Sequence, residues 1–203
     1  LRRPGEGRLH RHHADECVTE PSLRDRIIAA AAERTAVAGW SSVTMSRLAD
    51  DVGVSRQTVY NEVGAKPALA EAMVLDELAR FLAVVEAAFD EHPGDAVESV
   101  RAAVRGVLER AERSPLLRAI ASASQGGDTE LLPLLTTQAG SLLAASREVL
   151  RGRLRHLVDD RESADLDTAI DAVVRLVLSN VMQPSGSPAA TADEIAWVAG
   201  RLL

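Results

Sequence analysis

The chain has 203 residues, of which 46% are hydrophobic and 26% are charged, proportions typical of a soluble globular protein. No apolar stretch approaches the roughly 20 residues that a membrane-spanning helix requires, and residues 1–20 lack the apolar run of a signal peptide. The lone cysteine, Cys17, excludes an internal disulfide. We therefore expect a cytoplasmic protein.

The net charge of −7 is distributed unevenly along the chain. Residues 67–203 carry a net charge of −8, whereas residues 21–66 carry +1 and residues 1–20 are balanced. Charge by itself therefore gives little support for a nucleic-acid partner, so the sequence motifs must decide the question.

Residues 1–20 are predicted to be a disordered arm, since they combine Pro, Gly, Arg and His with almost no apolar periodicity. The histidines and Cys17 of this segment have no second cluster elsewhere that would complete a structural metal site. We interpret the arm as a solvated tail, with a basic DNA-contacting arm as the alternative.

Ordered structure is expected to begin with three short helices, at 23–38, 45–52 and 56–63, which are capped by Ser22, Thr44 and Ser55. Alanine- and leucine-rich segments then predict longer helices, and no segment alternates like a strand, so the predicted fold is all-α. These later helices are expected at about 66–91, 95–113, 115–124, 131–158, 164–182 and 192–202, the last one opening on a capping box at 191–194.

The segment 44–60, TMSRLADDVGVSRQTVY, has the pattern of a helix-turn-helix. Gly53 supplies the positive φ of the turn, and Ser55 restarts the helix. The inward positions of the two helices are apolar: Leu48, Ala49, Val52, Val54 and Val59. The second helix is then the one expected to enter a major groove.

Residues 26–69 resemble the N-terminal domain of the TetR family of transcriptional regulators. The matching positions are Ile27, Ala30, Ala31, Gly39, Trp40, Thr44, Leu48, Ala49, Val52–Ser55, Thr58–Tyr60, Lys66 and Leu69. The resemblance implies a three-helix DNA-binding domain at 21–66 and a larger helical domain for ligand binding and dimerisation at 67–203. It also implies a homodimer on a palindromic double-stranded operator, acting as a ligand-released repressor.

Roles for the DNA-contacting residues follow from the resemblance and from side-chain chemistry. Arg56 and Gln57 can pair bidentately with guanine and adenine, and Asn61 lies one turn beyond Gln57. Thr44, Tyr60 and Lys66 are expected to contact phosphates. The remaining candidates are Ser46, Arg47, Ser55 and Thr58. The alternatives are solvated surface for the charged groups and a buried core position for Tyr60.

The chain departs from the family pattern at Arg34, Thr35, Val63 and Ala65. The family has apolar residues at the first two positions, an aromatic at the third and a small polar cap at the fourth. We expect Trp40 to fill the space that Thr35 and Val63 leave.

The predicted helix 164–182 is apolar on nearly all sides, so it requires two buried faces. The resemblance implies that this helix and the last one build a four-helix dimer interface. The expected interface residues are Ile170, Val173, Val174, Val177, Val181, Trp197 and Val198. The alternative is a wholly intramolecular core.

The helices between 68 and 158 are candidate walls of an effector pocket. Their apolar residues are mostly aliphatic, which favours an acyl chain or another lipid over a planar drug. The candidate lining residues are Leu78, Phe81, Leu82, Val85, Phe89, Val104, Leu108, Leu117, Ile120, Gln138 and Leu142. The alternative is that these residues simply form the core.

No metal-ligand spacing, phosphate loop or nucleophile motif is present, so we expect neither an enzyme nor a cofactor. The alternative function is a helical binding protein for a small apolar, lipid-like ligand that does not bind DNA.

Overall fold

The computed structural model describes residues 20–123, 132–158 and 163–203, and every regular element in these ranges is a helix. The all-α prediction is thus confirmed for the described chain. The helices are α1 (Leu23–Ala38), the short 3-10 helix η1 (Trp40–Ser42), α2 (Met45–Val52), α3 (Arg56–Val63), α4 (Lys66–Glu91), α5 (Ala96–Arg113), α6 (Pro115–Ala123), α7 (Leu132–Leu154), α8 (Ser163–Met182) and α9 (Pro188–Leu202).

The start of the last helix was predicted wrongly. α9 begins at Pro188, and the Ser187 side chain accepts a hydrogen bond from the Ala190 N–H. Proline at the first helical position and serine at the N-cap form a start signal, which the capping-box pattern at 191–194 obscured. Thr191 lies inside the helix and is buried. α7 also ends earlier than predicted, at Leu154.

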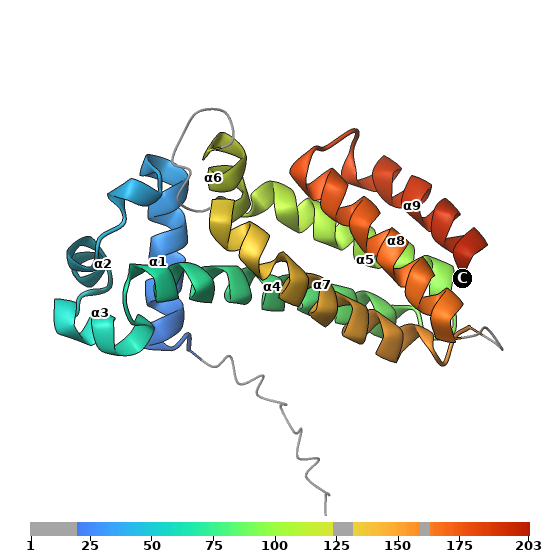
Figure 1. Ribbon diagram of the computed structural model, residues 1–203, viewed down its shortest axis with the longest axis horizontal. Helices are drawn as coiled ribbons and strands as arrows, with labels where there is room; N and C mark the ends of the chain where they lie inside the picture. The colour runs from blue at the N-terminus through green and yellow to red at the C-terminus, as the bar shows by residue number, and fades with distance from the viewer. Residues whose placement is uncertain (1–19, 124–131, 159–162) are drawn as a thin grey trace, which may run out of the picture.

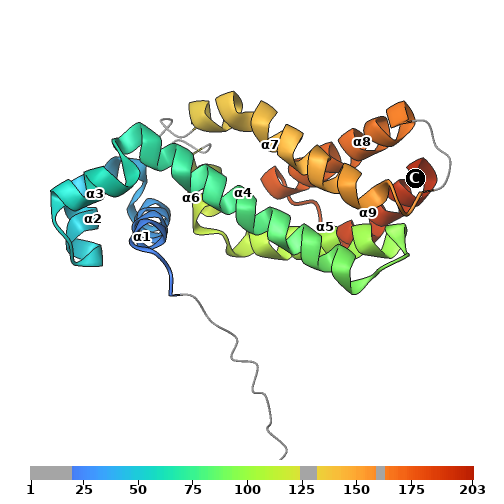
Figure 2. The same ribbon diagram turned by 90° about the horizontal axis from the view of Figure 1, so that it is seen from below.

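The molecule is elongated, with α1–α3 gathered at one end (Figure 1). α4 runs from that end along the larger domain, where it packs against α5, and α5 in turn packs against α9. Seen from below, α7 and α8 lie on the opposite side from α4 and α5 (Figure 2). The space enclosed between these two pairs of helices is where a cavity is found.

Two hydrophobic cores stabilise the two ends of the molecule. The core around α1–α3 also takes in the first half of α4, from Leu69 to Val74, and two residues of α6, Leu116 and Ile120. The second core joins the end of α4 to α5, α8 and α9. α4 and α6 therefore belong to the packing of the DNA-binding end as well as to that of the larger domain.

Close approach of α4 and α5 explains a glycine in the middle of α5. A Cβ atom added to Gly106 would lie 2.6 Å from Cγ1 of Val84 on α4. Because Val84 is β-branched, it has few alternative rotamers that would relieve this contact.

None of the described helices is long and apolar enough to cross a membrane.

Candidate DNA-binding surface and effector cavity

The turn between α2 and α3 has the expected local structure. The Thr44 side chain caps α2 by accepting from the Arg47 N–H, and Ser55 caps α3 by accepting from the Thr58 N–H. Gly53 adopts the left-handed conformation, with φ 74° and ψ 37°. Leu48, Ala49, Val52 and Val59 are buried, and Val54 is half-buried. These features confirm the predicted helix-turn-helix.

The outer face of α3 holds its polar side chains in two pairs. Nη2 of Arg56 donates to the Tyr60 hydroxyl at 3.2 Å, and the guanidinium lies 5.4 Å from the centre of the tyrosine ring. Nε2 of Gln57 donates to Oδ1 of Asn61 at 3.0 Å. All four residues are exposed. The Tyr60 hydroxyl thus lies at the surface rather than in the core.

The other candidate DNA contacts surround this face. Thr44, Ser46, Arg47 and Ser55 are exposed. Thr58 and Lys66 are half-buried, and the Lys66 ammonium lies 4.8 Å from the centre of the Trp40 ring. Nη1 of Arg47 donates to the Ser42 carbonyl at 2.9 Å, so this guanidinium is held against η1.

Two arginines of α1 support the motif, and the sequence analysis did not identify them. Nη2 of Arg26 donates to the Val52 carbonyl at the end of α2, at 2.9 Å. Arg24 donates to the Glu62 carbonyl near the end of α3. The last carbonyls of a helix lack backbone partners and carry partial negative charge, so both contacts are favourable. Their positions, four and two residues after Ser22, carry no signal that would have revealed them.

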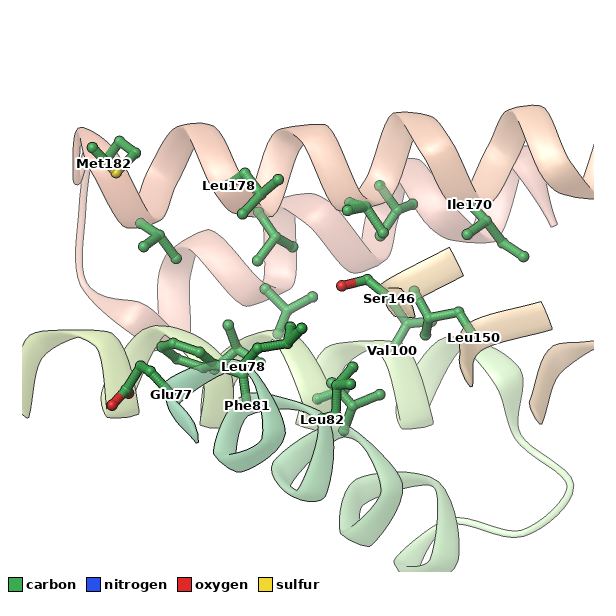
Figure 3. A pocket seen from close by; sticks show the side chains of 18 of the residues that line it. Glu77, Leu78, Phe81, Leu82, Val100, Ser146, Leu150, Ile170, Leu178 and Met182 are labelled. Carbon is green, nitrogen blue, oxygen red and sulfur yellow. The ribbon is translucent and has the colours of Figure 1, made fainter. Parts of the chain in front are cut away.

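A cavity of about 220 Å³ lies between α4, α5, α7 and α8, with α6 closing one end. Figure 3 shows Met182 and Glu77 at one end of the cavity and Ile170 and Leu150 at the other. Of its described lining residues, only Glu77 and Ser146 are polar, and only Phe81 is aromatic. A mostly apolar lining with few polar groups is typical of small-molecule sites.

Seven of the eleven candidate pocket residues line this cavity: Leu78, Phe81, Leu82, Val85, Val104, Leu117 and Ile120. Phe89 does not, because it is buried in the second core. The side chains of Gln138 and Leu142 lie outside the described part of the chain. The α8 wall of the cavity was not predicted, because α8 was expected to form the dimer interface.

An acidic group borders the apolar cavity. The Glu77 side chain is only 12% exposed, and its Oε1 lies 3.3 Å from Nε of Arg110. The pair lacks hydrogen-bond geometry, so the two charges attract one another without a bond. The Arg110 guanidinium also lies 5.6 Å from the centre of the Phe81 ring.

A second cavity, of about 180 Å³, adjoins the first. The two cavities share Leu117, Val181 and Met182 in their linings. The second one, here called the vestibule, is more polar. Its polar lining residues are Glu112, Arg118, Asn180 and Thr191, and the predicted pocket residue Leu108 also lines it.

The structure divides the candidate dimer residues into inner and outer sets. Ile170, Val173 and Val174 are buried in the subunit's own core, so they do not form an outer face. Their assignment to the dimer interface is corrected accordingly. Val177 and Val181 are half-buried and line the apolar cavity. The exposed apolar residues of α8 and α9 that line neither cavity are Leu176 and Trp197, and Val198 is half-buried. Leu178 and Met182 are also exposed, but both line the apolar cavity.

The departures from the family pattern are accommodated locally. Arg34 forms a two-pronged ion pair with Asp51 of α2, and the hydrogen bond from Arg34 holds the pKa of that carboxyl below its usual value. Thr35 is buried, and its hydroxyl donates to the Ala31 carbonyl at 2.6 Å.

Among the described residues, no group of acidic, histidine or cysteine side chains could hold a metal ion.

Two family models match the chain. One, described as bacterial regulatory proteins of the tetR family, matches residues 27–73. The other, described as the C-terminal domain of the bacterial tetracycline repressor, matches residues 95–201. The "HTH-type transcriptional regulator AlkX" of Mycobacterium tuberculosis (strain ATCC 25618 / H37Rv) is 28% identical over 162 residues, which cover 80% of this chain and 76% of that protein.

Solved structures show the same arrangement. The crystal structure of the TetR family repressor AlkX from Dietzia sp. strain DQ12-45-1b, implicated in biodegradation of n-alkanes, is 28% identical, with a TM-score of 0.67 over 89% of this chain and 95% of that one. The fatty acid degradation regulator FadR from Bacillus halodurans shares the fold alone, at 18% identity and a TM-score of 0.60 over 89% of this chain and 95% of that one. With matches to both of its domains, the chain belongs to the TetR family and is a DNA-binding transcriptional regulator.

Proposed function

We propose that the protein is a repressor that binds an inverted-repeat operator as a homodimer and releases it when an aliphatic molecule fills the cavity between α4 and α8. The observation that carries this proposal is that Val74, Leu116 and Ile120 line the cavity and also pack in the core of the DNA-binding end. A ligand that shifts these residues must also shift α1, against which α6 packs.

The chemistry of the ligand is inferred from the wall of the cavity. Aliphatic side chains dominate, and a single aromatic ring offers little surface on which a planar ligand could stack. Similarity to the Dietzia AlkX, implicated in biodegradation of n-alkanes, supports the same class of ligand. We therefore propose an alkyl-chain effector.

On the operator, we propose that Arg56, Gln57 and Asn61 read base edges and that Thr44, Tyr60 and Lys66 hold phosphates. Support comes from the exposed polar face of α3, where these side chains are hydrogen-bonded in pairs. Side chains that are already held in this way lose less conformational entropy when they bind DNA. A twofold dimer would place two such helices about 34–36 Å apart, one turn of DNA.

We propose the outward apolar residues of α8 and α9 as the surface that forms the dimer. Leu176 and Trp197 are exposed in the single subunit and line neither cavity. Large exposed apolar side chains gathered on neighbouring helices are typical of protein interfaces. A regulatory, non-catalytic role in the cytoplasm completes the proposal.

The experiment that tests the proposal is selection of bound sequences from a random duplex pool, using the full chain at low salt. We expect the wild-type protein to enrich an inverted repeat and the double variant Arg56→Ala/Gln57→Ala to enrich none. Folded, dimeric wild-type protein that enriched no sequence would contradict operator binding. It would favour the alternative of a ligand-binding protein without DNA function.

A further inference from the structure

The two adjoining cavities differ in chemistry in a way that suggests the form of the effector. The first is almost wholly apolar and extends along α8 from Ile170 to Met182. At a rise of 1.5 Å per residue, this stretch of helix is about 18 Å long. An apolar space that extends along this stretch of helix can accommodate an unbranched alkyl chain.

The vestibule lies at the Met182 end of this channel, since Leu117, Val181 and Met182 line both cavities. Each cavity alone is smaller than the roughly 300 Å³ at which small-molecule sites begin, whereas the two together exceed it. A ligand that occupied both would have its chain in the apolar channel and its polar end among the polar side chains.

The vestibule has an ordered polar wall. Nδ2 of Asn180 donates to the Leu176 carbonyl at 2.9 Å, and its Oδ1 accepts from the Ser185 hydroxyl at 2.9 Å. These bonds fix the Asn180 amide at the end of α8. Arg118 of α6 is the one cation among the described lining residues of either cavity.

From this arrangement, and resting on the proposed aliphatic effector, we propose that the two cavities form one site for a single-chain carboxylic acid. The alkyl chain lies between α4 and α8, and the carboxylate lies in the vestibule against Arg118. A guanidinium presents two parallel donors that match a carboxylate. Glu112 lies in the same vestibule and opposes the anion, so it limits the affinity.

Because Arg118 lies on α6, its contact with the head group is expected to affect DNA binding. Arg118 lies between Leu116 and Ile120, which pack in the core of the DNA-binding end. A carboxylate held by Arg118 would pull on the helix that touches α1, whereas a bare hydrocarbon would fill the channel without this contact. The acid is therefore expected to release DNA more effectively than a hydrocarbon with the same chain.

The test compares laurate, 1-dodecanol and dodecane by titration calorimetry on the full-length dimer, with operator release measured in parallel. Wild-type protein should bind laurate most tightly. Arg118→Ala should weaken laurate binding about tenfold while changing dodecanol binding little, since one charge-assisted contact is lost. Glu112→Gln should tighten laurate binding. The matched control is Arg113→Ala, which removes an exposed arginine that lines neither cavity and should bind laurate like wild type.

Occupation of the channel is tested separately by Leu78→Trp, which fills the space beside α8. This variant should lose laurate and dodecanol alike, and a cooperative thermal unfolding transition like that of the wild type shows that it is folded. Laurate binding that is equal in wild type, Arg118→Ala and Arg113→Ala would overturn the head-group assignment and leave the aliphatic effector standing. If wild type and both arginine variants failed to bind laurate, the head-group assignment and the aliphatic effector would both be overturned.

Discussion

At the scale of single residues, Trp40 is buried in the core of the DNA-binding domain. Trp40, Thr35 and Val63 are each no more than 3% exposed. Thr35 satisfies its own hydroxyl on the Ala31 carbonyl, so this corner of the core has no unpaired polar group. The indole also supports Lys66, whose ammonium lies over the ring. That Trp40 fills the space left by Thr35 and Val63 stays a prediction, which mutation of Trp40 can test.

Replacing Trp40 with alanine should destabilise the DNA-binding domain by about 3–5 kcal/mol, because a buried aromatic is lost and a cavity remains. Thermal or denaturant unfolding measures the effect, and operator affinity should fall with it. Trp40→Phe, which keeps most of the apolar volume, is the matched control and should lose far less. Unchanged unfolding of Trp40→Ala would refute the role of the indole.

The ion pair between Arg34 and Asp51 predicts a dependence of stability on pH. The pKa of Asp51 in the folded protein lies below its ordinary value of 3.8, chiefly because Arg34 donates hydrogen bonds to it. The pair therefore stabilises the fold fully above that value, and this contribution is lost as the pH falls through the folded pKa. Asp51→Asn should melt slightly below wild type at pH 7 and should match it in strong acid. A difference that persisted in acid would show that the carboxylate charge is not the cause.

At the scale of elements, the residues proposed to read bases lie on α3, whereas Lys66, proposed to hold a phosphate, lies at the start of α4. Gln57 and Asn61 face outward together, whereas Lys66 lies at the start of α4 against Trp40. The two groups should respond differently to mutation, since base contacts discriminate between sequences and phosphate contacts do not.

Gln57→Ala should cost about 1–3 kcal/mol on the best operator and relax the preference at one base pair. Lys66→Ala should weaken binding to all duplexes similarly and reduce the slope of log affinity against log salt by about 1. Binding isotherms at several salt concentrations, on the selected operator and on an unrelated duplex, distinguish the two. A uniform loss for Gln57→Ala would contradict its role in reading bases.

The paired helices α8 and α9 carry the proposed dimer surface. Trp197 is 60% exposed, and the Arg201 guanidinium lies 3.4 Å from the centre of its ring. Aromatic residues stacked with arginine are common at the energetic centres of interfaces. α8 also forms a wall of the cavity, so this helix has one face toward the cavity and another toward the proposed dimer partner.

Trp197→Ala should therefore weaken the dimer about tenfold or more, as measured by sedimentation over a range of protein concentrations. Operator affinity should fall with it, because each monomer holds only one half-site. Val37→Ala provides the control: Val37 is 84% exposed on α1, far from this face, and its truncation should leave the dimer intact. Equal dissociation of both variants would place the interface elsewhere.

At the scale of the whole molecule, the cavity and the DNA-binding end share packed residues rather than a flexible linker. Val74 of α4 and Leu116 and Ile120 of α6 belong to both. The coupling between the two sites is a free energy, so it must act in both directions.

Addition of operator duplex should consequently lower the affinity for laurate by the same factor by which laurate lowers the affinity for operator. Calorimetry with and without the duplex measures the first factor, and DNA-binding isotherms with and without laurate measure the second. Two factors that differed beyond experimental error would indicate that laurate does not act through the coupled two-site equilibrium.

The sequence by itself determined the local structure, because its signals are local. The caps Thr44 and Ser55 and the left-handed Gly53 act through hydrogen bonds and dihedral angles within a few residues, so their pattern predicted α2, α3 and the turn. Only the tertiary structure decided which side of an apolar helix faces the core, the cavity or solvent. Ile170 and Leu176 lie on one helix and read alike as apolar, yet Ile170 is buried beside the cavity and Leu176 is exposed, because burial depends on neighbours far away in the chain.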